Sequence, residues 1–597
     1  MLSQKFKNFK ISLQKFKDFL KPLKVFFGKG EKIAIIDAKF LWLVLMNGLT
    51  YALLYVDDFV AFLFKAFVWN FGLFFCVLYP CAIFKQSLCK VILNALFWVS
   101  FAVCVINLFL FINFNTFLDP VALQIFFATN TREASEFIGF YTGTSSIVVI
   151  LIFLAFTLLA FLSKFSLKVP KRLCLLIILI SIVPLSSNVI RASYNKTADK
   201  TLLLHFTRVF SKGYSEQMNF IKEYRNLSQR LDLMLAKKLT RERERERDEN
   251  LTQEKSYISQ SKQIPKIILI IGESTQRNYM QIYGYDLPTT PNLNELVRAE
   301  NLFIFDDVIS PKTSTSATLQ LVLTFSNYEN SHILPWYEQM NLIDAMKLLG
   351  YETFWLSNQE QISIYGNVAE AIAKRANLSR FSTTLSSLDT RKDEILLKMF
   401  DELMLAGSKQ FIVFYLMGTH SSYKRRYPSE FAKFNREILR QKGLDEFYGS
   451  QKPLNSKQLQ TRAEYANAVL YNDFVVSEIM QKFKDDEAIV FYLSDHGDEV
   501  YDTRNFAGHG AANRYTLEIP FMIYLSDKFK AAHPQILACI EAAQQKPFMS
   551  DNFIHALFDL LGIECVELDK SLSLFNGDFN ATRPRIIGGK DYDKVLK

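Results

Sequence analysis

The sequence predicts an α-helical membrane domain with five transmembrane helices, followed by an exported α/β sandwich domain. Three observations support this fold class. Apolar segments crowd the first third of the 597-residue chain, basic and acidic loops alternate between them, and strand-like and helix-like patterns alternate toward the carboxyl terminus. The predicted parts are a basic amphipathic segment at 1–38, the membrane domain at 39–190, a helical linker at 191–263 and the exported domain at 264–597.

The five apolar segments are each near the roughly 20 residues that a helix needs to cross a bilayer. Buried helices of a large soluble domain are the alternative, but so many segments in series with so few charges favour membrane spans. The last segment is short and contains Pro184. The segments are 40–56, 59–84, 91–112, 146–162 and 173–185.

The charges of the loops predict the orientation of the spans. Seven lysines lie between residues 5 and 24, further basic residues follow the second and fourth segments, and the opposite loops are acidic. The positive-inside rule therefore places the amino terminus in the cytoplasm, and five crossings place the chain after about Ser187 outside. The net charge of +9 needs no nucleic-acid partner, because the excess lysine can lie on anionic lipid at the amino terminus.

The linker is polar and predicted to be helical, with the mixed-charge run TRERERERDEN at 240–250. We expect a solvated bridge with no catalytic role. The exported domain has only two cysteines, Cys539 and Cys565, and the sequence leaves open whether they form a disulfide. A metal in this domain must rely on carboxylate, imidazole or hydroxyl ligands, because there is no cysteine cluster.

The exported domain begins with KIILIIGES, an unbroken apolar strand pattern that ends at Glu273. Such strands are typical of parallel sheets covered by helices on both faces, which bind ligands at the carboxyl ends of their strands. Alone, a helix start capped by Ser274 or Thr275 explains this stretch better. A second strand pattern at 488–494 ends in Asp495 and His496, and the two strand ends together favour a metal site. Further strands are predicted at 302–309, 352–356, 410–417 and 521–525, with helices at 341–349 and 465–484.

A hydroxyl-rich turn, SPKTSTS at 310–316, supplies candidate nucleophiles at a predicted helix start. Thr313, Ser314 and Thr315 would lie where the helix dipole and open backbone N–H groups attract a phosphate, although a hydroxyl-rich N-cap has the same composition. Three of the seven histidines fall in glycine-flanked polar turns, which favours a functional site. They are His420, His496 and His509.

In their order and spacing these motifs resemble the membrane phosphoethanolamine transferases of the alkaline phosphatase superfamily. The match follows the five spans and then GES, YGY, TTP, TSTSA, MGTH, YKRRYP, SDHGDEVYD and GHG. The resemblance implies a hydrolase-like exported domain of alkaline phosphatase type, in a multi-pass protein of the bacterial inner membrane whose catalytic domain is periplasmic. It also implies at least one Zn²⁺, held by Glu273, Thr315, Asp495 and His496.

The resemblance further implies a double displacement. Zinc would lower the pKa of the Thr315 hydroxyl, which attacks phosphatidylethanolamine, expels diacylglycerol and holds phosphoethanolamine until an envelope acceptor removes it. The implied acceptor is lipid A or a core sugar of lipopolysaccharide or lipooligosaccharide, or a protein. His420 and His509 are expected to face the phosphate or a further zinc, and Thr129 and Glu133 to lie near the ethanolamine headgroup.

The sequence departs from the family pattern at two positions of the expected site. Tyr415 stands where many relatives have a histidine, which leaves the second metal site open, and Asp498 stands where a glutamate is common. The exported domain also lacks most of the cysteines found in the lipid A-modifying branch of the family. Their absence favours the branch that acts on core heptose or related acceptors.

Three other functions compete with this interpretation. A phosphoglycerol transferase of the lipoteichoic acid synthase kind shares the spans, the metal glutamate, the threonine and the Asp–His pair, but cleaves phosphatidylglycerol; ATNTREA and TSTSA favour ethanolamine. A sulfatase is disfavoured because no cysteine or serine lies in a C/S-x-P-x-R context. An inactive sensor or scaffold is disfavoured because all four expected metal ligands are retained.

Overall fold

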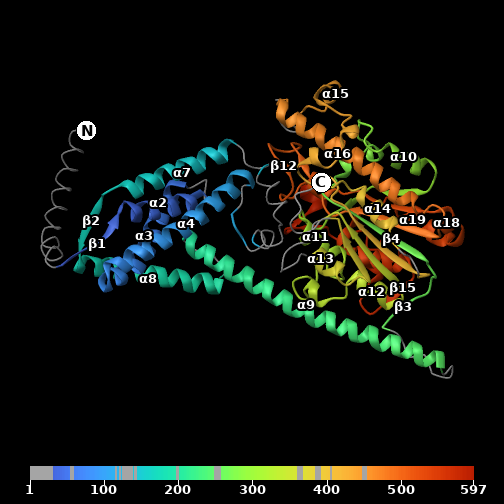
Figure 1. Cartoon of the computed structure of the whole chain (residues 1–597), viewed down its shortest axis with the longest axis horizontal. Helices are drawn as coiled ribbons and strands as arrows, with labels where there is room; N and C mark the ends of the chain where they lie inside the picture. Colours follow the sequence, from blue (N-terminus) through green and yellow to red (C-terminus); the bar gives the residue numbers. More distant parts are fainter. Residues whose placement is uncertain are drawn as a thin grey trace. The chain divides into compact units, whose positions relative to one another are not determined.

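The computed structural model describes residues 31–53, 59–114, 117–119, 123, 139, 144–195, 201–247, 257–359, 368–382, 391–403, 407–446 and 453–597. The chain divides into two compact units. The first contains Met1–Gln124 and Tyr141–Glu216, and the second contains Ile125–Phe140 and Gln217–Lys597. The first unit is mainly helical and the second is α/β (Figure 1).

A helix occupies each of the five apolar segments of the first unit. They are α2 (Ala38–Ala52), α3 (Phe59–Phe84), α4 (Gln86–Phe114), α7 (Thr144–Leu162) and α8 (Lys171–Asn195). The sequence did not predict the two-stranded sheet of β1 (Lys32–Asp37) and β2 (Ser166–Pro170) beside them. The expected amphipathic segment therefore ends in a strand, whose isoleucines pack into the helical core; residues 1–30 of that segment lie outside the described residues.

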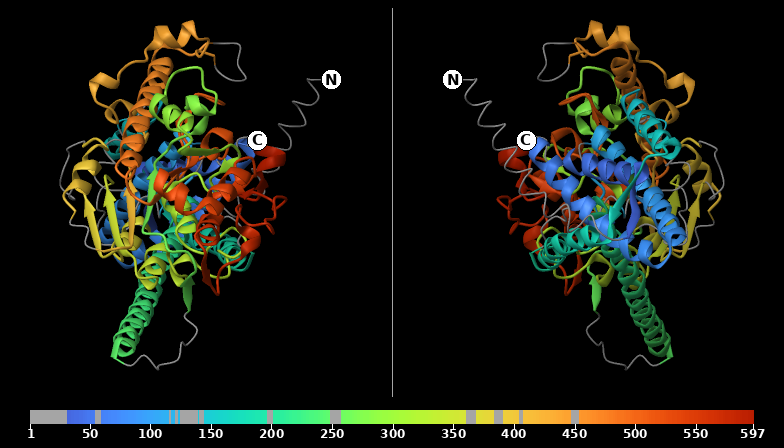
Figure 2. Two further views of the ribbon diagram at one scale, coloured as in Figure 1. Left: turned by 90° about the vertical axis from the view of Figure 1, so that its right-hand side faces the viewer. Right: turned by 90° about the vertical axis from the view of Figure 1, so that its left-hand side faces the viewer.

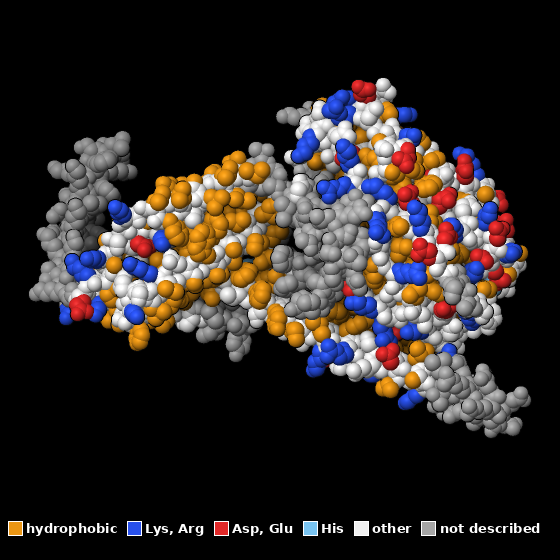
Figure 3. Space-filling model, in the orientation of Figure 1, with side chains coloured by type: hydrophobic (Ala, Val, Ile, Leu, Met, Phe, Trp, Pro, Cys, Tyr) orange, Lys and Arg blue, Asp and Glu red, His pale blue; other side chains and the backbone are white. Residues whose placement is uncertain are grey.

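Two helices of the described part are long and apolar enough to cross a membrane, judged by length and composition: Phe62–Phe84 and Gln86–Asn113. The apolar stretch Ile147–Leu162 of α7 is shorter. Exposed apolar side chains such as Phe84 and Leu162 are spread over the helices of this unit (Figure 3). The five predicted segments are thus helical, and among the described residues two of the helices have the length and composition of a membrane span.

The long helix α9 (Leu202–Arg247) corresponds to the expected linker. The prediction of a solvated bridge is wrong for residues 220–235 of this helix, which pack against the core of the α/β unit. Leu227 and Leu231 lie in the hydrophobic core of that unit, and the hydroxyl of Tyr224 donates to the Ala371 carbonyl at 2.9 Å. The apolar face of this part of the helix is therefore covered by protein rather than by water.

The second unit is built on a seven-stranded sheet in the order β5-β13-β10-β4-β9-β7-β8. All its strands run parallel except β13, which is antiparallel to both neighbours. The mainly parallel sheet confirms the predicted α/β sandwich, although β8 was not predicted. The strands are β4 (Lys266–Gly272), β5 (Leu302–Phe305), β7 (Glu352–Ser357), β8 (Leu378–Phe381), β9 (Gln410–Tyr415), β10 (Ala488–Ser494) and β13 (Phe521–Leu525).

Helices cover both faces of this sheet (Figure 1 and Figure 2). Ile267, Leu269 and Ile271 of β4 belong to one buried cluster, and Ile268 and Ile270 belong to the other. Burial on both faces explains why the strand shows no apolar–polar alternation. The first cluster includes side chains of α12 (Leu342–Leu348), α19 (Pro534–Ala543) and α20 (Phe553–Leu560), and the second includes those of α10 (Pro291–Arg298) and α16 (Ser456–Gln481).

The two cysteines of the α/β unit are not bridged. Cys539 is exposed on α19, and Cys565 is half-buried at the end of β15 (Ile563–Cys565), and both are free thiols. The fold of the α/β unit is therefore held by its core rather than by a disulfide between these residues.

Candidate active site

Three neighbouring parallel strands deliver the predicted site residues to one edge of the sheet. Gly272 of β4 lies opposite Ser494 of β10, and Ile271 lies opposite Tyr415 of β9. Because the strands are parallel and in register, the residues that follow them emerge side by side. Glu273 therefore meets the Asp495 turn although more than two hundred residues separate them in the chain.

A left-handed turn at Ser274, with φ of +58°, follows Glu273 directly. The backbone N–H of Ser274 donates to Oδ1 of Asp495 at 3.0 Å, and its hydroxyl donates to Oε1 of Glu273 at 3.0 Å. Non-glycine residues adopt this conformation at an energetic cost, which local hydrogen bonds must offset. Ser274 thereby holds the two carboxylates in fixed positions.

Thr315 is the first residue of α11 (Thr315–Val322). Its Oγ1 lies 3.2 Å from both carboxylate oxygens of Glu273 and 3.2 Å from Nε2 of His496. The hydroxyl of Thr313, by contrast, donates to the Gly510 carbonyl at 3.0 Å, and Ser314 occupies the N-cap position. Of the three candidate hydroxyls, the structure brings Thr315 to the carboxylates and the imidazole.

Asp495 and His496 are buried at the end of β10. Burial raises the pKa of Asp495 to about 6 and lowers the pKa of His496 to about 3, so this imidazole is neutral at pH 7. Nδ1 of His496 lies 3.1 Å from the Gly497 carbonyl, which fixes the ring proton there and leaves the Nε2 lone pair directed to Thr315.

The carboxylates of Glu273 and Asp495 and the imidazole of His496 form a group that could hold a metal ion, with ligand atoms within 4.8 Å of one another. Oδ2 of Asp495 is buried, lies 3.3 Å from Nε2 of His496 and accepts no hydrogen bond from any described residue. A buried carboxylate oxygen needs a partner, and a cation supplies one. With the Thr315 hydroxyl, the set offers the four oxygen and nitrogen donors that suit tetrahedral Zn²⁺.

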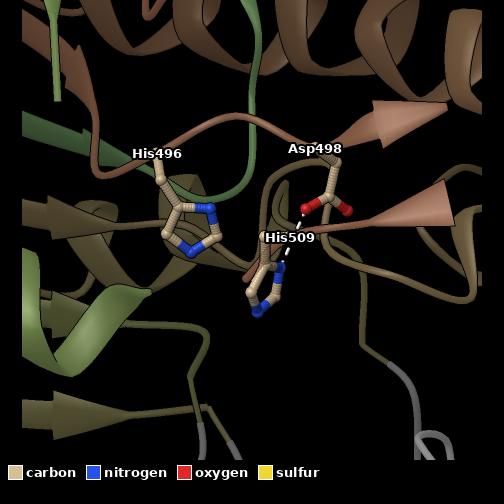
Figure 4. A group of neighbouring side chains, drawn as sticks. All are labelled: His496, Asp498 and His509. Atoms are coloured by element: carbon tan, nitrogen blue, oxygen red, sulfur yellow. Dashed lines mark hydrogen bonds and ion pairs between the residues drawn. The ribbon is translucent and has the colours of Figure 1, made fainter. Parts of the chain in front are cut away.

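His509 lies beside this cluster, after β12 (Ala507–Gly508). Its ring centroid is 4.3 Å from that of His496, and its Nδ1 is 2.8 Å from Oδ1 of Asp498 (Figure 4). Oδ2 of Asp498 accepts from the Tyr423 hydroxyl at 2.9 Å. His496, Asp498 and His509 form a second possible metal group, but both groups require His496, whose Nε2 already faces Thr315.

His420 completes the set of predicted histidines. Its ring centroid lies 6.0 Å from that of His509. Burial, and next the Arg426 guanidinium, lower the pKa of His420 well below its usual value, which keeps this imidazole neutral. The structure therefore brings all three histidines together beside the Glu273 carboxylate, which lies 3.6 Å from Nε2 of His496.

The chain can now be compared with known proteins. Residues 265–563 match the sulfatase family. Phosphoethanolamine transferase EptC of Escherichia coli O18:K1:H7 is 30% identical over 536 residues, which cover 87% of this chain and 87% of that protein. The chain belongs to the phosphoethanolamine transferase family. It is therefore an enzyme, a transferase with a sulfatase-type catalytic domain.

Solved structures share the fold of this chain. The zinc complex of the C-terminal periplasmic domain of EptC from Escherichia coli is 30% identical, with a TM-score of 0.50, and the match covers 58% of this chain and 97% of that domain. The integral membrane lipooligosaccharide phosphoethanolamine transferase A (EptA) of Neisseria meningitidis shares the fold over 90% of this chain and 98% of its own, at 18% identity and a TM-score of 0.62.

Two tyrosines of this phosphoethanolamine transferase hydrogen-bond to carboxylates of the site, and the sequence did not predict these bonds. Tyr415 at the end of β9 donates to Oε2 of Glu273 at 3.4 Å, and Tyr423 binds Asp498. YKRRYP signalled Tyr423 as part of a motif, but no pattern in the sequence pairs it with an acid 75 residues away. The proposed cap at Thr275 is wrong, because its hydroxyl lies 3.3 Å from the Glu273 carbonyl and 3.2 Å from the Thr419 hydroxyl instead.

Thr129 and Glu133, the residues expected near the ethanolamine headgroup, lie outside the described residues. Their contacts with the donor stay a prediction.

Gly418→Ala is expected to destabilise the site of this transferase more than an ordinary left-handed glycine replacement would. Gly418 has φ of +52°, and a Cβ there would lie 2.6 Å from the carbonyl oxygen and 2.8 Å from the nitrogen of Glu273. The backbone atoms of Glu273 cannot move aside as a flexible side chain can. Overpacking should therefore lower the free energy of unfolding by about 1–3 kcal/mol beyond the conformational cost of a left-handed alanine. Thermal unfolding of the full-length protein in detergent measures the loss.

Gly443→Ala is the matched control, because Gly443 has φ of +66° and no described atom lies within 4 Å of a Cβ built there. Gly443→Ala should lower the free energy of unfolding by the conformational cost alone, about 1–2 kcal/mol. Equal losses in the two variants would refute the close approach of Gly418 to Glu273.

Proposed function

We propose that this enzyme transfers phosphoethanolamine from phosphatidylethanolamine, through a covalent intermediate on Thr315, to an acceptor in the bacterial envelope. The observation that carries the proposal is the position of the Thr315 hydroxyl, 3.2 Å from both oxygens of Glu273 and from Nε2 of His496. A hydroxyl held among metal-ligand atoms at a helix start is suited to attack a phosphodiester.

Glu273, Thr315, Asp495 and His496 are proposed to hold one Zn²⁺. The unpartnered oxygen of Asp495 and the zinc in the related EptC domain support this assignment. When bound, the ion would stabilise the deprotonated Thr315 hydroxyl and offset charge on the phosphoryl oxygens. The 2.8 Å hydrogen bond from Nδ1 of His509 to Asp498 leaves Nε2 of His509 as the ring atom that could bind a second ion.

The chemistry divides into two displacements at one phosphorus. In the first, Thr315 Oγ1 bonds to phosphorus while the bond from phosphorus to the diacylglycerol oxygen breaks, and the proton lost by Thr315 ends on diacylglycerol. In the second, an acceptor oxygen bonds to phosphorus while the Thr315 ester breaks, and the proton lost by the acceptor returns to Thr315. No oxidant or further reactant is needed.

His509 and His420 are proposed to bind the phosphoryl oxygens and to carry these protons. Asp498 holds the Nδ1 proton of His509, and Tyr423 holds Asp498, so the ring is fixed in one tautomer. His420 is kept neutral by burial and by Arg426, which makes it a hydrogen-bonding partner rather than a second positive charge.

The proposed location is the bacterial inner membrane, with the amino terminus in the cytoplasm, the five helices crossing the bilayer and the α/β unit in the periplasm. This topology rests on the loop charges and on two helices that meet the length and composition of spans. It places Thr129 and Glu133 on the periplasmic side, where Glu133 can pair with the donor ammonium. The proposed acceptor is lipid A or a core sugar of lipopolysaccharide or lipooligosaccharide, or a protein.

Mass spectrometry of the covalent adduct tests the proposed reaction. Full-length protein in detergent is incubated with phosphatidylethanolamine, digested and sequenced, and we expect a phosphoethanolamine mass on Thr315. Phosphatidylglycerol in place of the donor should leave Thr315 unmodified. A phosphoglycerol adduct would instead indicate the lipoteichoic acid synthase type of reaction, and no adduct with either lipid would favour a scaffold.

A further inference from the structure

A cavity of about 230 Å³ lies in the α/β unit among side chains to which the proposed reaction gives no role. It is formed by five segments of the chain: the stretch after Glu273, the turn after α15 (Arg436–Gln441), the first part of α16, the loop after β11 (Glu499–Val500) and the start of α17 (Arg514–Leu517). Its walls are aromatic and polar. The residues that line it include Tyr279, Tyr285, Leu444, Arg462, Asp502 and Arg514.

This cavity adjoins the metal-ligand cluster. Tyr515, which also lines it, packs its backbone directly against Gly497, the residue after His496, because a Cβ on Gly497 would lie 2.3 Å from the Tyr515 carbonyl oxygen. The Gly497 N–H also donates to the Thr516 carbonyl at 3.0 Å. The cavity and the loop of His496 therefore share Tyr515 as a neighbour.

The Tyr285 side chain, which lines the cavity, carries a polar group that packing does not explain. Its oxygen is buried, and within the described part of the chain it has no hydrogen-bond partner. The ring stacks on Tyr279 with centroids 4.8 Å apart, so the hydroxyl cannot easily turn to solvent. Buried hydroxyls are ordinarily satisfied, so the Tyr285 hydroxyl is a polar group in the wall of the cavity that the described residues leave without a partner.

The two arginines of the cavity differ in what they can offer a ligand. Arg462 is already bonded to the carbonyls of Leu444 and Glu446 and lies 3.5 Å from Asp502, so it forms a rigid, charge-balanced wall. Arg514 is 44% exposed and lies 3.4 Å from Glu518, a carboxylate that also faces Arg277 at 3.5 Å. The Glu518 carboxylate is thus shared by two guanidinium groups, and Arg514 retains N–H groups that can donate to an anion.

We propose that this cavity binds one sugar ring of the acceptor, with Arg514 contacting an anionic substituent such as a phosphate. Aromatic faces combined with planar polar side chains suit the alternating C–H and O–H surfaces of a sugar. The volume is below the roughly 300–1,000 Å³ of sites for larger ligands, which fits a single ring. The assignment rests on the proposed function, because it names the part of the acceptor that the enzyme recognises.

Leu444→Trp tests the cavity by filling it. In a full-length Thr315→Ala background, which blocks turnover, the dissociation constant for purified lipooligosaccharide should rise at least tenfold. Val566→Trp is the matched control, because Val566 is 82% exposed and does not line the cavity; its binding should equal that of the parent. Tyr285→Phe removes only the unpartnered hydroxyl and should weaken binding several-fold, which covers the case in which the tryptophan disturbs folding.

Arg514→Gln tests the anionic contact with the same glycolipid before and after removal of its phosphates. The parent protein should prefer the phosphorylated form, and the variant should bind both forms equally. Unchanged lipooligosaccharide affinity in both Leu444→Trp and Tyr285→Phe would overturn the sugar site. Preference for the phosphorylated form retained in Arg514→Gln would overturn the anion contact.

The adduct on Thr315 separates failure of the sugar site from failure of the proposed function. With Thr315 present, Leu444→Trp should form the phosphoethanolamine adduct at the rate of the unmodified protein, because the donor does not use the cavity. A slower adduct would assign the cavity to the donor and overturn the proposal. Loss of glycolipid binding in Leu444→Trp, together with no adduct in the unmodified protein, would reject the proposed reaction and retain the sugar site.

Discussion

Thr315→Ala is expected to abolish phosphoethanolamine transfer while the protein stays folded. The substitution removes a hydroxyl that lies 3.2 Å from each oxygen of Glu273, and it keeps a good helix former at the start of α11. Because a covalent mechanism has no substitute for its nucleophile, turnover should fall on the order of 10³-fold or more. Release of diacylglycerol from phosphatidylethanolamine by the full-length enzyme measures the loss.

Thr313→Ala is the matched control for this prediction. It makes the same change two residues earlier, where the hydroxyl donates to the Gly510 carbonyl and contacts none of the candidate metal ligands. Its turnover should stay within about threefold of the unmodified enzyme, as expected for an exposed hydrogen bond. Comparable losses in the two variants would mean that the turn as a whole, rather than the Thr315 hydroxyl, is required.

Asp495→Asn is expected to remove the bound metal. Oδ1 can still accept the backbone N–H groups of Ser274 at 3.0 Å and His496 at 2.7 Å, so the turn should keep its shape. The other oxygen, which lies 3.3 Å from Nε2 of His496, becomes an NH₂ group without a lone pair for a metal. Zinc per protein, measured by elemental mass spectrometry after gel filtration, should fall from about one equivalent to near zero.

Asp473→Asn provides the comparison, since Asp473 is also buried and accepts backbone N–H groups at the start of α10, including that of Leu293 at 2.9 Å. Its zinc content should be unchanged. Zinc retained at full occupancy in Asp495→Asn would exclude Asp495 as a ligand and would favour the group around His509.

Much of the fold could be predicted because its strands and apolar helices are strongly patterned. β4 and β10 are buried on both faces, so an unbroken apolar run was sufficient to identify each. β8 was missed because its four residues, LSRF, are only half-buried and include an arginine. The packing of α9 against the α/β unit was not predicted, because the helix is mostly polar and only a few of its residues are apolar and enter the core.

The site was predictable in its components but not in its hydrogen bonds. Glu273, Asp495 and His496 followed from strand ends, and the resemblance selected Thr315 among three hydroxyls. The bonds from Tyr415 to Glu273 and from Tyr423 to Asp498 had no sequence signal, because each joins residues on different strands or loops. Such pairs exist only once the sheet has brought the loops together.

The sequence by itself determined which chemical groups this protein can use: a hydroxyl-rich helix start, carboxylates and histidines after buried strands, and an apolar first third. The tertiary structure alone decided which of them meet. Parallel register places the ends of β4 and β10 side by side, so that the Ser274 N–H reaches a carboxylate 221 residues away. Local sequence governs local backbone preferences, whereas the meeting of distant side chains depends on the packing of the whole sheet.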